Sequence, residues 1–304
     1  MIRVENLTKK YGEKIAVNNI SFEIGEGRIW GFLGPNGAGK TTTMRIITGY
    51  LPPTEGRAYV AGLDPIINSR EVKALIGYLP ENPPLYNDMT VESYLAFVAK
   101  IKGVKGKKIK ENMEKVIEET GLEDVRSRLI RNLSKGYKQR VAIAQALIHE
   151  PKILILDEPT IGLDPAQIKE IRELIKSLRK DRTIILSTHI LAEVTQICDG
   201  VVIINEGKIV ANGFLDELTK SFAEKEGVFL RLKNFGPAEK LIFENIEGVK
   251  EVYEGNGGVN IEWERGANLA EKIAKVAIEK GMGLLEMRSL TPDIETIYLK
   301  AISQ

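Results

Sequence analysis

The sequence predicts an α/β fold built around a parallel β-sheet and a phosphate-binding loop, followed by a small α+β domain. Three observations lead to this prediction. The run Ile29–Leu33 is apolar and is followed by a glycine-rich loop and a helix-like run at 41–48. A second apolar run at 153–156 ends in two acidic residues. The third observation is a separate alternation of strand and helix patterns after residue 225. Continuous aliphatic runs of this length are typical of strands buried on both faces of a parallel sheet.

The glycine-rich loop at 34–41 matches the phosphate-binding pattern G-x-x-x-x-G-K-[ST]. Glycines let consecutive backbone N–H groups converge on phosphate oxygens, and the helix N-terminus adds about half a positive charge there. Lys40 would reach the β- and γ-phosphates, and the Thr41 hydroxyl would be a Mg²⁺ ligand. A glycine-rich turn without a ligand is the alternative. The predicted nucleotide-binding residues of this segment are Gly34, Pro35, Asn36, Gly37, Ala38, Gly39, Lys40, Thr41 and Thr42.

Two acidic residues follow the second predicted strand. Asp157 would hold Mg²⁺ directly or through water. Glu158 is placed to polarise an attacking water, a general-base role worth about 10²–10⁴ in rate. An Asp-Glu-Pro sequence can also simply end a strand in a turn. We favour the catalytic interpretation, because a metal and a water would offset the desolvation cost of acidic residues beside a buried strand.

The segment 133–140, Leu-Ser-Lys-Gly-Tyr-Lys-Gln-Arg, resembles the signature motif L-S-G-G-Q of ATP-binding cassette (ABC) ATPases. It opens a helical run at 141–148, so Ser134 is a candidate N-cap. The resemblance implies that Ser134 and Gly136 face the γ-phosphate held by the opposing subunit. Lys135 and Tyr137 replace the usual glycine and glutamine. The residues expected to contact the γ-phosphate are kept, whereas those expected on the ribose side differ from the family pattern.

Three further segments match the same family in order and spacing. Asp164, within 161–165, looks like the D-loop residue that crosses the dimer interface. A buried strand at 184–188 precedes His189, which matches the switch histidine and would hydrogen-bond the γ-phosphate and hold the water-activating glutamate. Taken alone, a histidine at a strand end is more often structural. Tyr11 matches the aromatic residue that stacks on adenine.

One motif departs from the family pattern. Glu81, within 76–82, occupies the place of the Q-loop glutamine. Glutamine offers a neutral carbonyl to Mg²⁺ and to the lytic water, whereas glutamate adds negative charge beside the γ-phosphate. Glu81 must therefore lie nearer the metal than the phosphate, or swing away until a membrane partner engages. A glutamate here resembles the branch of ABC ATPases that serves type-2 exporters.

The length of 304 residues exceeds one nucleotide-binding domain, so we expect two domains. The resemblance implies a P-loop NTPase (RecA-like) ABC core over 1–218, with antiparallel β and helical subdomains, the latter at about 88–150. It should begin with short strands carrying hairpin-like turns, as at 24–28, and close with a hairpin at 201–211.

The remainder, 225–304, has the order β-α-β-β-α-β of a small α+β, ferredoxin-like domain. It shows no catalytic motif, so its role is interaction or regulation, or only stabilising the dimer. Trp263 is expected to pack rather than stack on a ligand. The predicted strands are 228–233, 249–254, 259–264 and 284–288, with helices at 237–245, around 269–277 and at 292–302.

Composition limits which binding partners and which cellular compartment are expected. The 43 Lys and Arg residues balance 42 Asp and Glu residues, so no nucleic acid is expected as the main partner. The single cysteine, Cys198, excludes an intramolecular disulfide and fits a reducing compartment. No apolar run approaches the roughly eighteen residues of a membrane helix, and the start lacks the apolar core of a signal peptide. We expect a cytoplasmic protein, peripheral on the inner face of the membrane, that works with a separate transmembrane permease.

The resemblance implies an ATP-hydrolysing exporter subunit that uses ATP and Mg²⁺ and forms a head-to-tail homodimer, or pairs with another cassette, on ATP binding. Within the type-2 branch, the segment 133–147 is most similar to gliding-motility-associated ATPases. Ribosome-acting relatives usually carry two cassettes, and relatives acting on DNA ends carry a long coiled coil, for which the interval between Lys40 and Ser134 has no room. A scaffold that binds ATP without hydrolysing it remains the alternative, to which Glu81 and Lys135 give some weight.

Overall fold

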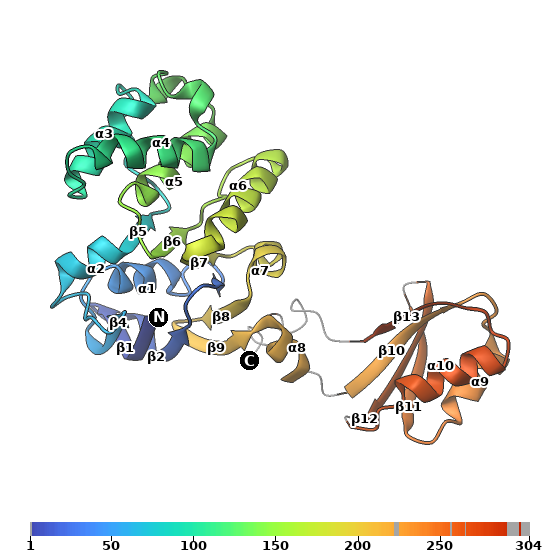
Figure 1. Ribbon diagram of the computed structural model, residues 1–304. Coiled ribbons are helices and arrows are strands. Elements are labelled where there is room, and N and C mark those ends of the chain that lie inside the picture. Colours follow the sequence, from blue (N-terminus) through green and yellow to red (C-terminus); the bar gives the residue numbers. More distant parts are fainter. Residues whose placement is uncertain (1, 222–224, 256, 265, 291–297, 299–304) are drawn as a thin grey trace. The chain divides into compact units, whose positions relative to one another are not determined.

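The computed structural model describes residues 2–221, 225–255, 257–264, 266–290 and 298 (Figure 1). The chain divides into two units, Met1–Leu215 and Asp216–Gln304. The boundary lies at the start of helix α8 (Leu215–Ser221), a few residues before the predicted domain end at 218. In the described residues, no helix combines the length and the apolar character that a membrane-crossing segment requires.

A six-stranded sheet with the order β5-β6-β7-β3-β8-β9 forms the centre of the first unit. All neighbouring pairs are parallel except β8 and β9. Strands β3, β6 and β7 are buried along their whole length, as their aliphatic runs predict. Their carboxyl ends meet at one edge, where the predicted motifs follow. The strands are β3 (Ile29–Leu33), β5 (Ile76–Leu79), β6 (Ile153–Asp157), β7 (Thr183–Thr188), β8 (Gly200–Asn205) and β9 (Lys208–Phe214).

The β8–β9 pair confirms the hairpin predicted at 201–211. Its two turn residues, Glu206 and Gly207, have φ values of 47° and 76°. Positive φ at both central residues matches the twist of the adjoining strands.

A second, antiparallel sheet has the order β2-β1-β4. The prediction of short strands with a hairpin-like turn at 24–28 is wrong. Strands β1 (Ile2–Tyr11) and β2 (Lys14–Ile24) have 10 and 11 residues. Since Ile24 pairs with Ile2 of β1, whereas Ile29 pairs with Ile184 of β7, the chain changes sheet between β2 and β3. Strand β4 spans Glu55–Val60.

Helix α1 (Lys40–Ile47) packs between these two sheets. Its Met44 and Ile47 are fully buried in a core that also contains Phe22 of β2 and Phe32 of β3, whose ring centroids lie 5.5 Å apart. This packing fixes the N-terminus of α1 at the carboxyl end of β3.

The segment 91–147 is largely helical, and Figure 1 shows α3, α4 and α5 gathered in one group. Their shared core includes Tyr94, Ile117 and Val141. Helix α5 also contacts strand β5, which connects this group to the central sheet. The helices are α2 (Ser69–Leu75), α3 (Val91–Ile101), α4 (Lys108–Thr120) and α5 (Lys135–Leu147), followed beyond β6 by α6 (Pro165–Ser177) and α7 (Leu191–Ile197).

The second unit has the element order β-α-β-β-α-β and one antiparallel sheet with the order β11-β12-β10-β13. Trp263 is 3% exposed and packs in its core, as predicted. The helix predicted at 292–302 falls outside the described residues apart from 298. The elements are β10 (Lys225–Leu232), α9 (Pro237–Glu244), β11 (Val249–Gly255), β12 (Gly258–Glu264), α10 (Ala270–Glu279) and β13 (Leu284–Ser289).

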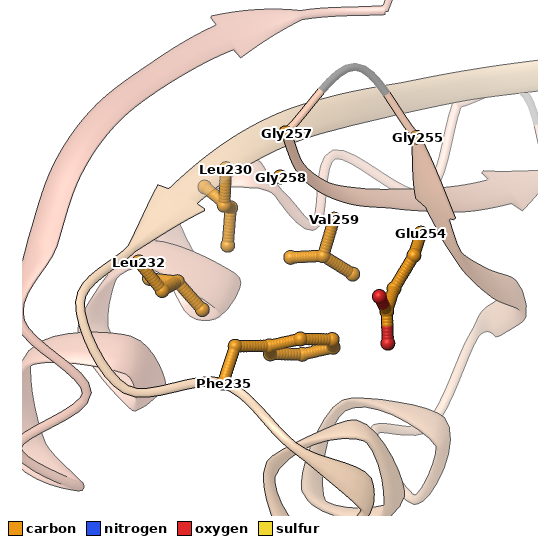
Figure 2. Close-up of a pocket in the computed structure, with 8 residues that line it drawn as sticks. All are labelled: Leu230, Leu232, Phe235, Glu254, Gly255, Gly257, Gly258 and Val259. Carbon is orange, nitrogen blue, oxygen red and sulfur yellow. The ribbon is translucent and has the colours of Figure 1, made fainter.

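A pocket of about 430 Å³ opens on this unit beside the β11–β12 connection. Figure 2 shows Leu230, Leu232, Phe235 and Val259 around it, with the Glu254 carboxylate at one side. The residues lining it carry no cationic side chain that could bind phosphate.

Candidate active site

The phosphate-binding loop passes from the end of β3 into α1, and its glycines are required by its shape. Gly37 and Gly39 have φ values of 81° and 108°, a region that other residues rarely adopt. A Cβ on Gly39 would lie 2.6 Å from the carbonyl oxygen of Ala16, and one on Gly34 would lie 2.2 Å from that of Ile204. The loop is therefore held tightly against β2 and β8.

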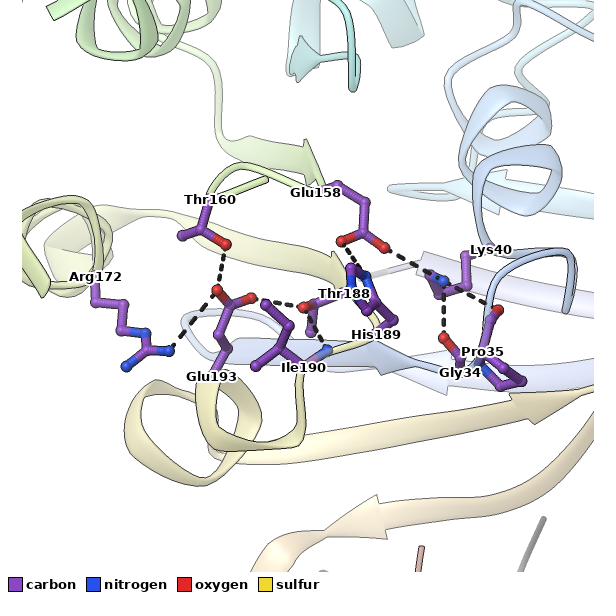
Figure 3. A network of polar contacts seen from close by, with 10 residues as sticks. All are labelled: Gly34, Pro35, Lys40, Glu158, Thr160, Arg172, Thr188, His189, Ile190 and Glu193. Atoms are coloured by element: carbon purple, nitrogen blue, oxygen red, sulfur yellow. Dashed lines mark hydrogen bonds and ion pairs between the residues drawn. The ribbon is translucent and has the colours of Figure 1, made fainter. Parts of the chain in front are cut away.

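Lys40 is the first residue of α1, and its side chain is buried. Its ammonium donates hydrogen bonds to the carbonyl oxygens of Gly34, at 2.8 Å, and Pro35, at 3.2 Å. The same ammonium lies 3.3 Å from Oε1 of Glu158 (Figure 3). These contacts fold the side chain back over the loop, where a phosphate would sit.

A pocket of about 520 Å³ adjoins this loop. It brings together residues from three predicted motifs, because Lys40 and Thr41 line it together with Glu81 and Glu158. Of the other predicted nucleotide-binding residues, Gly34, Pro35 and Ala38 belong to the loop but not to the pocket wall. The remaining lining residues are Tyr11, Lys14, Ala16, Asn36, Gly37, Gly39, Thr42 and Ile161.

Tyr11 ends β1 at one side of this pocket, and 47% of its surface is exposed. The ammonium of Lys9 lies 5.5 Å from its ring centroid. An exposed ring at the edge of a phosphate site can stack on a nucleotide base, so the adenine contact stays a prediction with suitable geometry.

Asp157 is the last residue of β6 and is buried. Among the described residues, neither of its carboxylate oxygens has a hydrogen-bond partner of normal geometry. Burial raises the pKa of Asp157, and the nearby hydroxyls of Ser187 and Thr41 oppose that rise. Two buried, unsatisfied oxygens next to a hydroxyl fit a hard cation such as Mg²⁺.

The described part of the chain contains no cluster of three or more His, Cys, Asp or Glu residues that could hold a metal alone. Mg²⁺ at nucleotide sites is usually bound by one or two protein ligands plus phosphate oxygens and water. Thr41 and Asp157 suit that mode, and Glu81 lines the same pocket as Thr41.

Glu158 has a φ of 50°, which is uncommon for a residue other than glycine. Its backbone N–H donates to the carbonyl oxygen of Ser187 at 2.9 Å, and its side chain is buried. One carboxylate oxygen faces Lys40, and the other lies 2.9 Å from Nδ1 of His189. Backbone strain that persists at such a position is often part of a functional site.

His189 follows β7 directly and is about one-third exposed. Its contact with Glu158 (Figure 3) is the one by which a switch histidine would hold the glutamate in place. Because Nδ1 is engaged there, Nε2 is the ring nitrogen that would reach a phosphate.

The signature residues lie apart from the pocket. Ser134 caps α5 and accepts a hydrogen bond from the backbone N–H of Tyr137 at 3.3 Å, which confirms the predicted N-cap. Gly136 is buried, and a Cβ at that position would lie 3.3 Å from the side chain of Gln167. Neither Ser134 nor Gly136 lines the pocket that contains Lys40. The ammonium of Lys135 lies over the backbone of Gly162 in the D-loop segment.

Asp164 has a local role besides the one predicted from the D-loop resemblance. Its carboxylate caps α6 by accepting a hydrogen bond from the backbone N–H of Gln167 at 2.9 Å. The following proline is a recognisable signal for this role, since proline is favoured in the first turn of a helix. Asp164 is also exposed, so the cap leaves it accessible to a second subunit.

Glu193 in α7, which is fully buried, was not predicted from the sequence as a functional residue. It hydrogen-bonds two threonines that flank the catalytic motifs, Thr160 and Thr188. An acidic residue between the apolar positions 191 and 194 was the available signal.

Comparison with known proteins places this geometry in one family. A family model described as "ABC transporter" matches residues 17–161. The chain is 34% identical to the uncharacterized ABC transporter ATP-binding protein YxlF of Bacillus subtilis, over 99% of both chains. It is 36% identical to the bacitracin transport ATP-binding protein BcrA of Bacillus licheniformis, over 99% of this chain and 97% of that protein.

Solved structures agree with this result. A bacterial ABC transporter cassette solved as a dimer superposes with a TM-score of 0.63 and 27% identity, covering 71% of this chain and 99% of that chain. A post-hydrolysis state of the same cassette, bound to ADP and Pi, gives the same values. With close relatives spanning its whole length, the protein belongs to the ATP-binding subunits of ABC transporters.

Proposed function

We propose that the protein hydrolyses Mg-ATP in the pocket at the P-loop and thereby drives export through a separate membrane permease. The position of Glu158 carries this proposal. Its carboxylate contacts Lys40 of the phosphate loop on one side and His189 on the other. A scaffold that only binds ATP has no need for a buried base held at this point.

Each residue then has a defined task. The loop N–H groups and Lys40 bind the phosphates, and Glu158 takes a proton from the attacking water. His189 keeps Glu158 oriented through its 2.9 Å contact. Thr41 and Asp157, with Glu81 as a further candidate, would hold Mg²⁺, which neutralises charge that develops on the phosphates.

The active site is proposed to be shared between two copies of the chain. Ser134 caps an exposed helix start outside the pocket, and a helix N-terminus binds anions well. A second subunit placed head to tail would bring its Ser134 and Gly136 to the γ-phosphate. The dimeric state of the solved cassette relative supports this arrangement.

The direction of transport and the location are also proposals. The name of BcrA, a bacitracin transport protein, and that of the lantibiotic transport protein SrtF of Streptococcus pyogenes favour an export system. A subunit that couples to a permease would lie on the cytoplasmic face of the membrane. The likeness to gliding-motility ATPases stays a prediction, as does an interaction or regulatory role for residues 225–304.

Two measurements test this function. Purified protein should hydrolyse Mg-ATP, and tight ATP binding without turnover would favour the scaffold alternative. Affinity purification from native membranes should recover a protein with several membrane spans. Recovery of ribosomes or DNA in its place would contradict the transport assignment.

Glu81 gives a further prediction. Glu81→Gln restores the family's neutral side chain beside the phosphates and removes one negative charge. We therefore expect this variant to bind Mg-ATP at least as tightly as the wild type and to raise basal hydrolysis. Calorimetric titration with Mg-ATP checks the affinity, and a large loss of affinity would show instead that Glu81 is a required metal ligand.

A further inference from the structure

A buried carboxyl group lies beside the two segments that carry Glu158 and His189. Glu193, in the first turn of α7, has 0% of its surface exposed. One of its oxygens accepts a hydrogen bond from the hydroxyl of Thr160, and the other accepts one from the hydroxyl of Thr188 at 2.6 Å. Figure 3 shows this group beside the Glu158–His189 pair.

The two threonines belong to the segments that carry the proposed base and its histidine. Thr160 lies two residues after Glu158, and Thr188 lies directly before His189. The Thr188 hydroxyl also accepts a hydrogen bond from the backbone N–H of Ile190 at 3.0 Å. The Thr188 hydroxyl that binds Glu193 therefore also binds Ile190, so the residues on both sides of His189 belong to this network.

Arg172 of α6 supplies the matching positive charge. Its guanidinium lies 3.9 Å from the Thr160-bound oxygen of Glu193 and donates to Oε1 of Gln196 at 2.8 Å. The network thus joins α6 and α7 to the ends of β6 and β7.

We propose that Glu193 is a positioning residue for hydrolysis, because it joins the Glu158 segment to the His189 segment. This inference rests on the proposed roles of those two residues. Burying a carboxylate costs several kcal/mol unless it is well paired, so a packed apolar side chain would serve stability at least as well. A buried polar network, in contrast, restricts the relative position of the groups it joins. Here those groups set the 2.9 Å contact between His189 and Glu158.

The test compares Glu193→Gln and Thr188→Val with the wild type. The two threonine hydroxyls donate to different oxygens of Glu193. Glutamine replaces one of those oxygens with an NH2 group, which cannot accept, and valine keeps the shape of threonine without the hydroxyl. We expect kcat to fall by about tenfold to a hundredfold, because small misplacements of catalytic groups have effects of that size. The Kd for Mg-ATP should stay within about twofold, since no network residue lines the pocket.

Glu173→Gln is the matched control. Glu173 is an exposed residue of α6 that pairs with Lys176 at 3.1 Å. This variant removes one negative charge, as Glu193→Gln does, but at an exposed position of α6, the helix that also carries Arg172. Its kcat should equal that of the wild type. An equal loss of kcat in Glu173→Gln and Glu193→Gln would overturn the proposal.

A double-variant comparison shows whether Glu193 acts through His189. In a His189→Ala background, adding Glu193→Gln should have little further effect on kcat, because the positioned group is gone. A full additional loss would overturn the proposal. So would unchanged kcat in Glu193→Gln, or an affinity for Mg-ATP that falls in parallel with kcat.

A second readout does not depend on turnover. The chain has two histidines, His149 and His189, so their imidazole NMR signals can be assigned with His189→Ala. Glu193→Gln should shift the His189 signals and leave those of His149 in place. If the wild type lacked hydrolysis, the proposed function would fail while this readout still decided the positioning role. Unmoved His189 signals would overturn it.

Discussion

Lys40→Ala is expected to weaken Mg-ATP binding by about a hundredfold or more and to abolish turnover. Lys40 is the cationic residue of the loop at 34–41, and the other groups of that loop expected to bind a phosphate are backbone N–H groups. Removing one partner from a buried, hydrogen-bonded charge pair costs roughly 2–5 kcal/mol. The variant also leaves the buried Glu158 without the ammonium that lies 3.3 Å away in the wild type.

Calorimetric titration with Mg-ATP and a steady-state hydrolysis assay measure the two effects. Lys115→Ala is a suitable control, because Lys115 is exposed and pairs with Glu150 at 2.6 Å, away from the pocket. The control should behave as the wild type. Equal ATP affinity for Lys40→Ala and the wild type would contradict the assignment of the phosphate site.

The sequence predicts those parts of the fold that short stretches of chain determine. The strand ending at Leu33, the loop and the helix beginning at Lys40 follow one another, so their pattern is complete within about twenty residues. The N-cap at Ser134 is of the same kind, because the hydroxyl and the N–H it accepts from are three residues apart.

Contacts between distant segments were not predictable in this way. Glycines at 25 and 27 predict a turn, but nothing local shows that the strand before them pairs with β1 and the strand after them with β7. The contact of Lys40 with Glu158 and that of Glu193 with Thr160 also join segments far apart in the chain. Such pairs depend on the order of strands in the sheet.

Glu158→Gln is expected to convert the protein into a stable dimer in the presence of ATP. The substitution keeps the size of the buried side chain while removing the proposed base, so bound ATP would persist. Its γ-phosphate would then be held by Lys40 of one subunit and by Ser134 and Gly136 of the other. Hydrolysis normally removes this bridge, which would let the dimer open and move the membrane partner.

Light scattering after size exclusion measures the result. The Glu158→Gln protein should be mainly monomeric without nucleotide, dimeric with saturating Mg-ATP, and much less dimeric with ADP. A population that stays monomeric with ATP would argue against the shared site. Because the second unit has its own core, it could also associate by itself, and a chain ending at Leu215 separates the two contributions. If that shorter chain still dimerises with ATP, the second unit is not needed for dimerisation. The first unit, which carries Lys40 and Ser134, is then sufficient to join the subunits around ATP.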